Sequence, residues 1–352
     1  MGMRDTDGRG IVAASGIRRL IHLISLRMPP PVVGILGFIS VALWLQNCAQ
    51  VAREAKMDFV KVKSAIASSE IEITLENSFI ENYKNRVTID VAFTVDKTDG
   101  HPHPKFLDGD FHISGRAPEI GLPIVAEIKN AALEQEVVSL IRHAEGTGRP
   151  FRMVGVWRLW PEHVGKASEV QGEYVSPTGF TNPDHVFEIH PLTRVDNQSL
   201  LDSLHPVEGY SPGKADAVFR SLQSVKCTIV PTQETTTIVT AKGQFNDVEF
   251  LLEIAGDPPQ VAQDGTFVNA AVLDLKGDRL VDKIRMVFLK DTPPERTVSG
   301  LQRGQRLHVF ALPRIDLSNV AWRTQHSKDN PELLNLTLPY EVIVVGVYID
   351  RN

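Results

Sequence analysis

Two histidines and several carboxylates gather in a turn-rich segment, residues 96–109. His101 and His103 are separated by a single proline, and imidazole and carboxylate groups are ordinary metal ligands. This pair could hold a metal ion if His112 or Asp99 completed the shell. We favour the alternative of an exposed loop stiffened by prolines, because no cysteine and no close triad of Asp, Glu and His accompanies the pair. The candidate metal ligands are His101, His103, Asp108 and Asp110, and the sequence indicates no cofactor.

The pair Glu188 and His190 is a second chemical candidate, because the two residues share one side of an expected strand and have the groups of a general acid/base pair. His185 lies five residues before His190, so we expect these two histidines to face opposite sides and not to share a ligand. A structural role is the alternative. Arg152 and Arg158 face outward on the preceding strand, and one of them would form a cross-strand ion pair with Glu188. We favour the ion pair, because nothing supplies a nucleophile.

These candidates belong to a segment, residues 85–195, whose side-chain periods predict five strands and one helix. Apolar residues alternate in the first strand at Val87, Ile89, Val91, Phe93 and Val95, which is a strong strand pattern. After the third strand the period changes to that of a helix at Leu133, Val137, Leu140 and Ile141. Three strands, a helix and two strands is the element order of the OB-fold, a small barrel plugged by a helix, and the segment resembles that fold.

The remainder of the chain also predicts a mainly β protein with short helices. A polar stretch, residues 196–213, is expected to connect the first barrel to a second β-rich domain, residues 214–352. The run from Ile284 through a short helix to Arg314 resembles the run from Ile124 through a helix to Arg158. A second, diverged OB-like barrel is therefore possible, and a β-sandwich is the alternative.

OB-fold proteins bind ligands on the outer faces of strands two and three, under the loops that follow strands one and four. The resemblance therefore implies a ligand site near those loops. The candidate binding residues are His101, His103, His112, Arg116 and Tyr174. The two outer faces carry no aromatic residue, and the chain has a net charge of -6. Because single-stranded nucleic acid is usually held by aromatic stacking in a basic groove, we expect no nucleic-acid partner.

Two short fragments, Asp108-Gly-Asp110 and Arg116-Ala-Pro-Glu119, are similar to parts of the staphylococcal-nuclease-like family, whose catalytic domain is also an OB barrel. This resemblance would make Asp108 or Asp110 a calcium ligand, Glu119 the residue that activates water and Arg116 a phosphate ligand. The fragments lie closer together than in that family, and no second arginine is identifiable.

The N-terminal segment, residues 1–52, combines a basic start with an apolar core, Val32 to Leu45. Arginines before an apolar core are typical of a signal peptide or a membrane anchor. We expect residues 53–84 to form a stalk or linker and the bulk of the chain to lie outside the cytoplasm. Cys48 and Cys227 are the only cysteines, so an exported part would contain no internal disulfide.

From the sequence we therefore expect an exported or membrane-anchored, non-catalytic binding or assembly module of the cell envelope. Its partner would be an unidentified envelope protein or a small ligand. The alternative is a metal-dependent envelope hydrolase that uses an acidic and histidine site on the first barrel. A fold class does not by itself reveal function, so both remain hypotheses.

Overall fold

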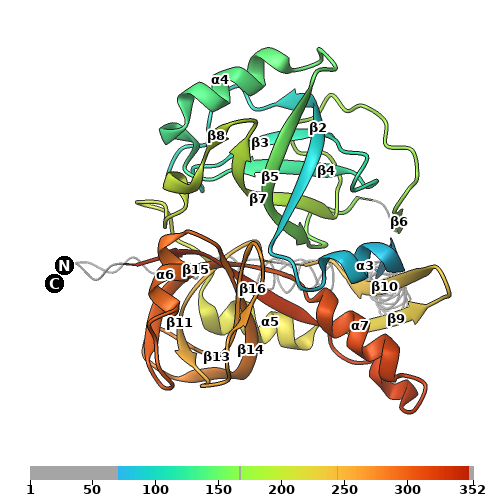
Figure 1. Cartoon of the computed structure of the whole chain (residues 1–352), viewed down its shortest axis with the longest axis vertical. Helices are drawn as coiled ribbons and strands as arrows, with labels where there is room; N and C mark the ends of the chain where they lie inside the picture. The colour runs from blue at the N-terminus through green and yellow to red at the C-terminus, as the bar shows by residue number, and fades with distance from the viewer. Residues whose placement is uncertain (1–69, 166–167, 244, 349–352) are drawn as a thin grey trace, which may run out of the picture. The chain divides into compact units, whose positions relative to one another are not determined.

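The computed structural model describes residues 70–165, 168–243 and 245–348. These residues form a mainly β protein that contains two five-stranded barrels and a few short helices (Figure 1). The predicted fold class is confirmed at this level.

The first barrel is built in the order expected for an OB-like fold. Its strands are β2 (Thr88–Thr98), β3 (Phe111–Arg116), β4 (Ile124–Ile128), β5 (Pro150–Leu159) and β7 (Phe187–Val195). They pair in the order β2-β3-β4-β7-β5 and back to β2, and the parallel pair β4 and β7 closes the barrel. The helix α4 (Gln135–Ala144) lies at one end of the barrel (Figure 1). Along the chain it comes between the third strand and the fourth.

The alternation that predicts these strands is also the pattern of burial. Ile89, Val91, Phe93 and Val95 lie in β2 and are buried in the main core, whereas Val87 precedes β2 and is buried in a cluster with residues of the second barrel. In α4 the buried residues are Val137, Val138, Ile141 and Ala144. Leu133 is 59% exposed, because the predicted helix is interrupted there by a separate 3-10 turn, η1 (Ala131–Leu133).

The second barrel repeats the topology of the first. Its strands are β11 (Val248–Ile254), β13 (Gly265–Leu273), β14 (Arg279–Leu289), β15 (Arg306–Ile315) and β16 (Tyr340–Val347). They pair in the order β11-β13-β14-β16-β15 and back to β11, again with one parallel pair, β14 and β16. The helix α6 (Pro293–Val298) has the same place in the chain order as α4. The second domain is therefore a barrel and not a sandwich.

A third, four-stranded sheet lies outside both barrels and joins distant parts of the chain. Its order is β6 (Ser168–Val170), β1 (Glu70–Glu76), β10 (Thr235–Ala241) and β9 (Cys227–Pro231). The strand β1 and the helix α3 (Asn77–Tyr83) belong to the segment expected as a stalk. The remaining elements are α5 (Ala215–Ser224), α7 (Leu317–His326), η2 (Leu201–Ser203), η3 (Pro331–Leu334) and the short strands β8 (Gln198–Ser199) and β12 (Gln260–Val261).

The two barrels are joined by a reciprocal pair of buried arginines. Arg158 on β5 donates to the carbonyl of Pro313 at 2.9 Å, and Arg314 on β15 donates to the carbonyl of Trp157 at 2.9 Å. Each arginine therefore binds the residue that precedes the other arginine. The predicted similarity between the two runs ending at Arg158 and Arg314 corresponds to this pair of contacts.

The predicted signal or anchor segment, with its apolar core at residues 32–45, lies outside the described residues. Among the residues that the structure does describe, no helix is long and apolar enough to span a membrane. The envelope location that the sequence predicts stays a prediction.

Candidate ligand-binding face of the first barrel

The outer face of the first barrel carries charged side chains that are nevertheless buried. Strand alternation points them away from the apolar barrel interior, and the second barrel covers part of them. The Nζ atom of Lys129, for example, lies 4.9 Å from the ring centroid of Phe310 on β15. The buried members of this face are Asp110, Glu127, Lys129, Arg158, Glu188 and His190. Because a buried charge is costly unless it is paired, these groups are expected to compensate one another.

His190 is surrounded by carboxylates. Its Nδ1 atom lies 3.2 Å from Glu127 and its Nε2 atom 3.5 Å from Asp110, which in turn accepts a 2.9 Å hydrogen bond from Lys129. Burial disfavours the imidazolium, but the charge of Glu127 and contacts with Asp110 and Glu188 raise the His190 pKa to about 10. His190 is therefore a cation of a buried network at neutral pH.

Glu188 forms the predicted cross-strand ion pair. It lies opposite Arg158 in the register of β5 and β7, and the two side chains are in direct contact. Burial alone would raise the pKa of Glu188, but the charge of Arg158 and close contacts with His185 and His190 hold it well below its usual range. Glu188 and His190 are 0% and 1% exposed.

One detail of the sequence prediction is wrong. His185 and His190 do contact a common group, since His185 lies 3.4 Å and His190 3.5 Å from the Glu188 carboxylate. The reason is that β7 begins at Phe187, so His185 precedes the strand and does not follow its alternation.

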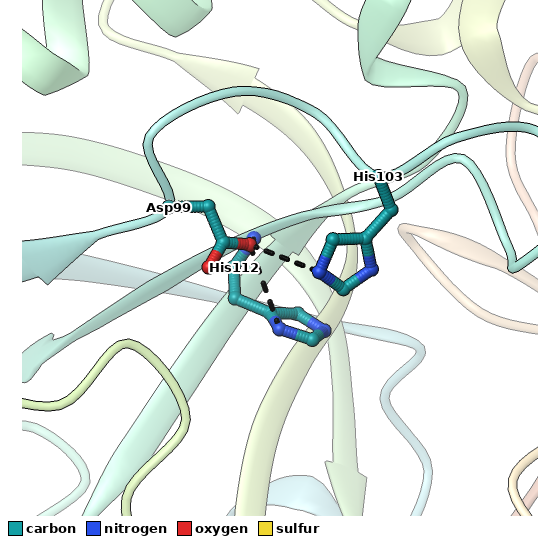
Figure 2. Close-up of side chains that lie close together, drawn as sticks. All are labelled: Asp99, His103 and His112. Carbon is teal, nitrogen blue, oxygen red and sulfur yellow. Dashed lines mark hydrogen bonds and ion pairs between the residues drawn. The ribbon is translucent and has the colours of Figure 1, made fainter.

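A second cluster lies where the loop between β2 and β3 meets β3. Asp99, His103 and His112 each offer a ligand atom, and these atoms lie within 4.8 Å of one another (Figure 2). The Asp99 Oδ2 atom is 3.4 Å from His103 Nε2 and 3.6 Å from His112 Nδ1. His101 is exposed and is not a member of this cluster. The structure therefore brings together His103 with the two residues that the sequence offered to complete its shell.

The remaining candidates surround this cluster. Asp108 lies 2.9 Å from His103 Nδ1, and Glu127 lies 3.7 Å from His112 Nε2. Burial disfavours the charged form of His103, but the bond to Asp108 and the charges of Asp108 and Asp99 raise its pKa. Glu127 also contacts His190, so it connects the cluster to the buried network.

The loop between β5 and β7 forms a groove on the first barrel. A cavity of about 530 Å³ lies there, and its lining includes Gly115, Ile124, Glu173, Tyr174, Phe180 and Asp184. Tyr174 is 84% and Phe180 74% exposed. The hydroxyl of Ser114 on β3 donates to the carbonyl of Phe180 at 2.6 Å and so holds this loop against the barrel.

The residues named by the nuclease resemblance have separate partners. Arg116 makes a two-pronged ion pair with Asp96, and Glu119 accepts a hydrogen bond from the backbone N–H of Ala92. Asp110 binds Lys129. The side chains that the resemblance would assign to calcium, water and phosphate are therefore already paired with other groups of the protein.

Sequence reasoning missed Phe106, which is 71% exposed in the loop between β2 and β3. Its position between Pro104 and Gly109 in a polar, turn-rich segment is a signal that could have identified it, because an aromatic ring there has no apolar period to join.

No protein-family model matches the chain, and no curated protein matches it. Among solved structures, it is similar to the single-stranded DNA binding protein from Thermus aquaticus, with 9% identity, 76% of this chain and 92% of that chain covered, and a TM-score of 0.20. A murine DNA binding protein bound with double-stranded DNA gives 9% identity, 74% and 98% coverage and a TM-score of 0.16. A replication protein A heterotrimer bound to single-stranded DNA gives 10% identity, with 74% of this chain and 55% of that chain covered, and a TM-score of 0.19.

These comparisons contradict the expected envelope module with no nucleic-acid partner, because the similar structures are DNA-binding proteins. At such TM-scores the likeness transfers no ligand to this chain. The expectation also had a faulty premise: it took the outer faces of β3 and β4 as the ligand surface. Those faces are largely buried, and the exposed aromatic residues lie on the loops instead.

Proposed function

We propose that the chain binds single-stranded nucleic acid through the two long loops of the first barrel. The observation that carries this proposal is the position of the exposed aromatic side chains. Among the described residues the exposed large aromatics are Phe106, Tyr174, Phe180 and Trp322. The first three lie on the loops that follow β2 and β5, the loops that close over ligands in OB-folds.

Stacking supplies most of the affinity in this proposal. Each base stacked on an aromatic ring contributes about 1 to 3 kcal/mol, and every base offers such a face. Tyr174 and Phe180 line the same cavity and leave most of their ring surface open. Glu173 and Asp184 line that cavity too, so the phosphates of a bound strand lie away from it.

Two basic side chains beside the groove offer a place for those phosphates. A second cavity is lined by Lys97 and Arg142, by the carboxylates of Asp99 and Glu145, and by Thr181, the residue after Phe180. The two cavities therefore meet at the tip of one loop. Because Lys97 is already paired with Glu145, we expect only about one phosphate contact, and log K should fall with log salt by a slope near -0.7.

The test is a titration of the full chain with a fluorescently labelled oligothymidylate of about twelve nucleotides, a typical OB-fold site length. Anisotropy reports binding. Tyr174→Ala and Phe180→Ala should each weaken binding by roughly 5- to 150-fold, the equivalent of about 1 to 3 kcal/mol. Arg142→Ala should flatten the salt dependence. Trp322→Ala is the matched control, because this aromatic is also exposed but lies on α7 of the second barrel.

Two results would overturn the proposal. One is the absence of binding by the wild-type chain to both oligothymidylate and oligouridylate at low salt. The other is equal binding by all the variants. Binding of a neutral oligosaccharide in place of the oligonucleotide would assign the aromatic groove to sugars, which also stack on aromatic rings.

A further inference from the structure

We propose that Asp99, His103 and His112 form a binding site for a divalent d-block cation of the Zn²⁺ type (Figure 2). Asp99 directly follows β2, His103 lies within the next loop and His112 lies on β3. Two backbone N–H groups fix this arrangement: that of His103 donates to the carbonyl of Asp110 at 2.7 Å, and that of His112 donates to the Asp99 side chain, at Oδ2, at 2.9 Å.

The distances fit metal ligands better than hydrogen bonds. Asp99 Oδ2 lies 3.4 Å from His103 Nε2 and 3.6 Å from His112 Nδ1. Good hydrogen bonds between such atoms are about 2.7 to 3.2 Å long. Ligand atoms around a tetrahedral ion with bonds of about 2.1 Å are separated by about 3.4 Å. Two of the three pairs of ligand atoms are therefore already spaced as metal ligands are, and the third pair lies within 4.8 Å.

The outer nitrogen of each imidazole faces a carboxylate. His103 Nδ1 lies 2.9 Å from Asp108, and His112 Nε2 lies 3.7 Å from Glu127. Metal-binding histidines usually have such a partner, which fixes the tautomer and makes the inner nitrogen more basic. His103 has such a hydrogen-bonded partner, and the outer nitrogen of His112 faces Glu127 at a longer distance. Two histidines aimed at one carboxylate oxygen, one of them fixed from behind by Asp108, are the second observation that indicates a metal.

The donor set and the exposure define the class of ion. Two imidazoles and one carboxylate suit Zn²⁺ and its d-block neighbours, whereas Mg²⁺ and Ca²⁺ prefer oxygen ligands. The side chains of His103, Asp99 and His112 are 28%, 13% and 14% exposed, so water reaches the site. Three protein ligands leave a fourth position for water or a ligand group, the coordination of an open zinc site.

The buried group of Asp110, Glu127 and His190 is a poorer candidate, although its atoms also lie close together. Lys129 already neutralises Asp110, and His190 is itself a cation between carboxylates. A further divalent charge would have no unpaired anion to bind there. The inference is therefore restricted to the partly exposed cluster.

The experiment is a Co²⁺ titration of the full chain after treatment with a chelator and dialysis, without nucleic acid. We expect the visible absorption of a tetrahedral or five-coordinate Co²⁺ complex, saturating at one ion per chain and abolished by Zn²⁺. His103→Ala and His112→Ala should each remove this absorption. Asp108→Asn should weaken Zn²⁺ binding by roughly 10- to 100-fold, the usual effect of removing such a partner.

His101→Ala is the matched control, because His101 is an exposed histidine on the same loop. It should bind Co²⁺ as the wild type does. Absorption that persists in His103→Ala, or that is lost in His101→Ala, would overturn the assignment, as would a wild-type chain that binds no Co²⁺.

Thermal unfolding with and without Zn²⁺ guards against misfolding: Zn²⁺ should raise the Tm of the wild type and of His101→Ala, and leave that of His103→Ala unchanged. Since the readout needs no oligonucleotide, its failure is distinct from failure of the proposed function.

Discussion

The two barrels share one topology, but corresponding outer faces have opposite chemistry. The strand registers equate residues of β3, β4 and β7 with residues of β13, β14 and β16. His112, Glu127, Lys129 and His190 in the first barrel take the places of Phe267, Val287, Leu289 and Ile343 in the second. The same scaffold thus presents a charged face once and an apolar face once.

One polar feature is common to both barrels. Arg158 and Glu188 are register partners in the first, and Arg314 and Glu341 are register partners in the second, where Arg314 Nε donates to Glu341 at 2.7 Å. These pairs support the reciprocal contacts between the barrels. The Arg–Glu pair therefore belongs to the scaffold. The second barrel adds Arg285 on β14, which lies 3.2 Å from Glu341, and the other charges of the first barrel have apolar counterparts.

The apolar face of the second barrel is a packing surface. Its side chains form a buried cluster with Val87 and Val156 of the first barrel. The members contributed by the second barrel are Phe267, Val287, Leu289, Phe310, Leu312, Ile343 and Val345. Since apolar residues can often replace a buried ionic group without loss of stability, the charged face of the first barrel is not needed for packing. The partly exposed member of the charged face, His112, belongs to the proposed metal site, and the buried network contacts that site through Glu127.

The largest expected effect comes from making the first barrel resemble the second. Glu127→Val alone, or His190→Ile alone, removes one partner of a buried ion pair and should lower the free energy of unfolding by about 3 to 5 kcal/mol. The double variant removes both charges and copies Val287 and Ile343. It should recover most of that loss, because Asp110 keeps Lys129 and Glu188 keeps Arg158.

A double-mutant cycle by urea denaturation measures this coupling. A double variant whose loss equals the sum of the two single losses would show that the two faces are not interchangeable. It would also remove the argument that the charges exist for function.

A comparable effect is expected from pH. The His190 pKa is raised from an ordinary value of 6.5 to about 10, so the charged form stabilises the fold. This contribution is complete below pH 6.5 and is lost as the pH rises to about 10, a change on the order of a few kcal/mol. The apolar counterpart, Ile343, has no such dependence.

Urea midpoints between pH 6.5 and 10 check this prediction. The wild type should lose stability over this window more steeply than the double variant Glu127→Val with His190→Ile, which lacks the group. Equal slopes would mean that His190 is neutral in the folded chain. His143→Ala, which removes an exposed histidine on α4, should retain the wild-type slope.

Strand alternation and helix period make the first barrel predictable from the sequence, because the run from Ile89 to Val95 has only one buried face. For the second domain the sequence predicts strands but leaves a barrel and a sandwich as alternatives. The site is less predictable. Asp99 and His103 were recognised as possible ligands, but their contact with His112 depends on how the loop after β2 folds back, and local sequence does not encode that distance. The burial of Glu127 depends on the barrel interface, so an outward position was mistaken for an exposed one.

The smallest effect concerns the loop that carries Phe180. Ser114→Ala removes the hydroxyl that donates to the Phe180 carbonyl and should lower stability by only about 1 kcal/mol. Because this bond holds the loop on the barrel, amide hydrogen exchange in residues 174–182 should become faster and oligonucleotide binding weaker. The register counterpart of Ser114 is Asn269, which donates to Asp257 at 3.1 Å in the second barrel. Asn269→Ala should leave exchange in residues 174–182 unchanged, and the same acceleration in both variants would show that the bond from Ser114 does not position the loop.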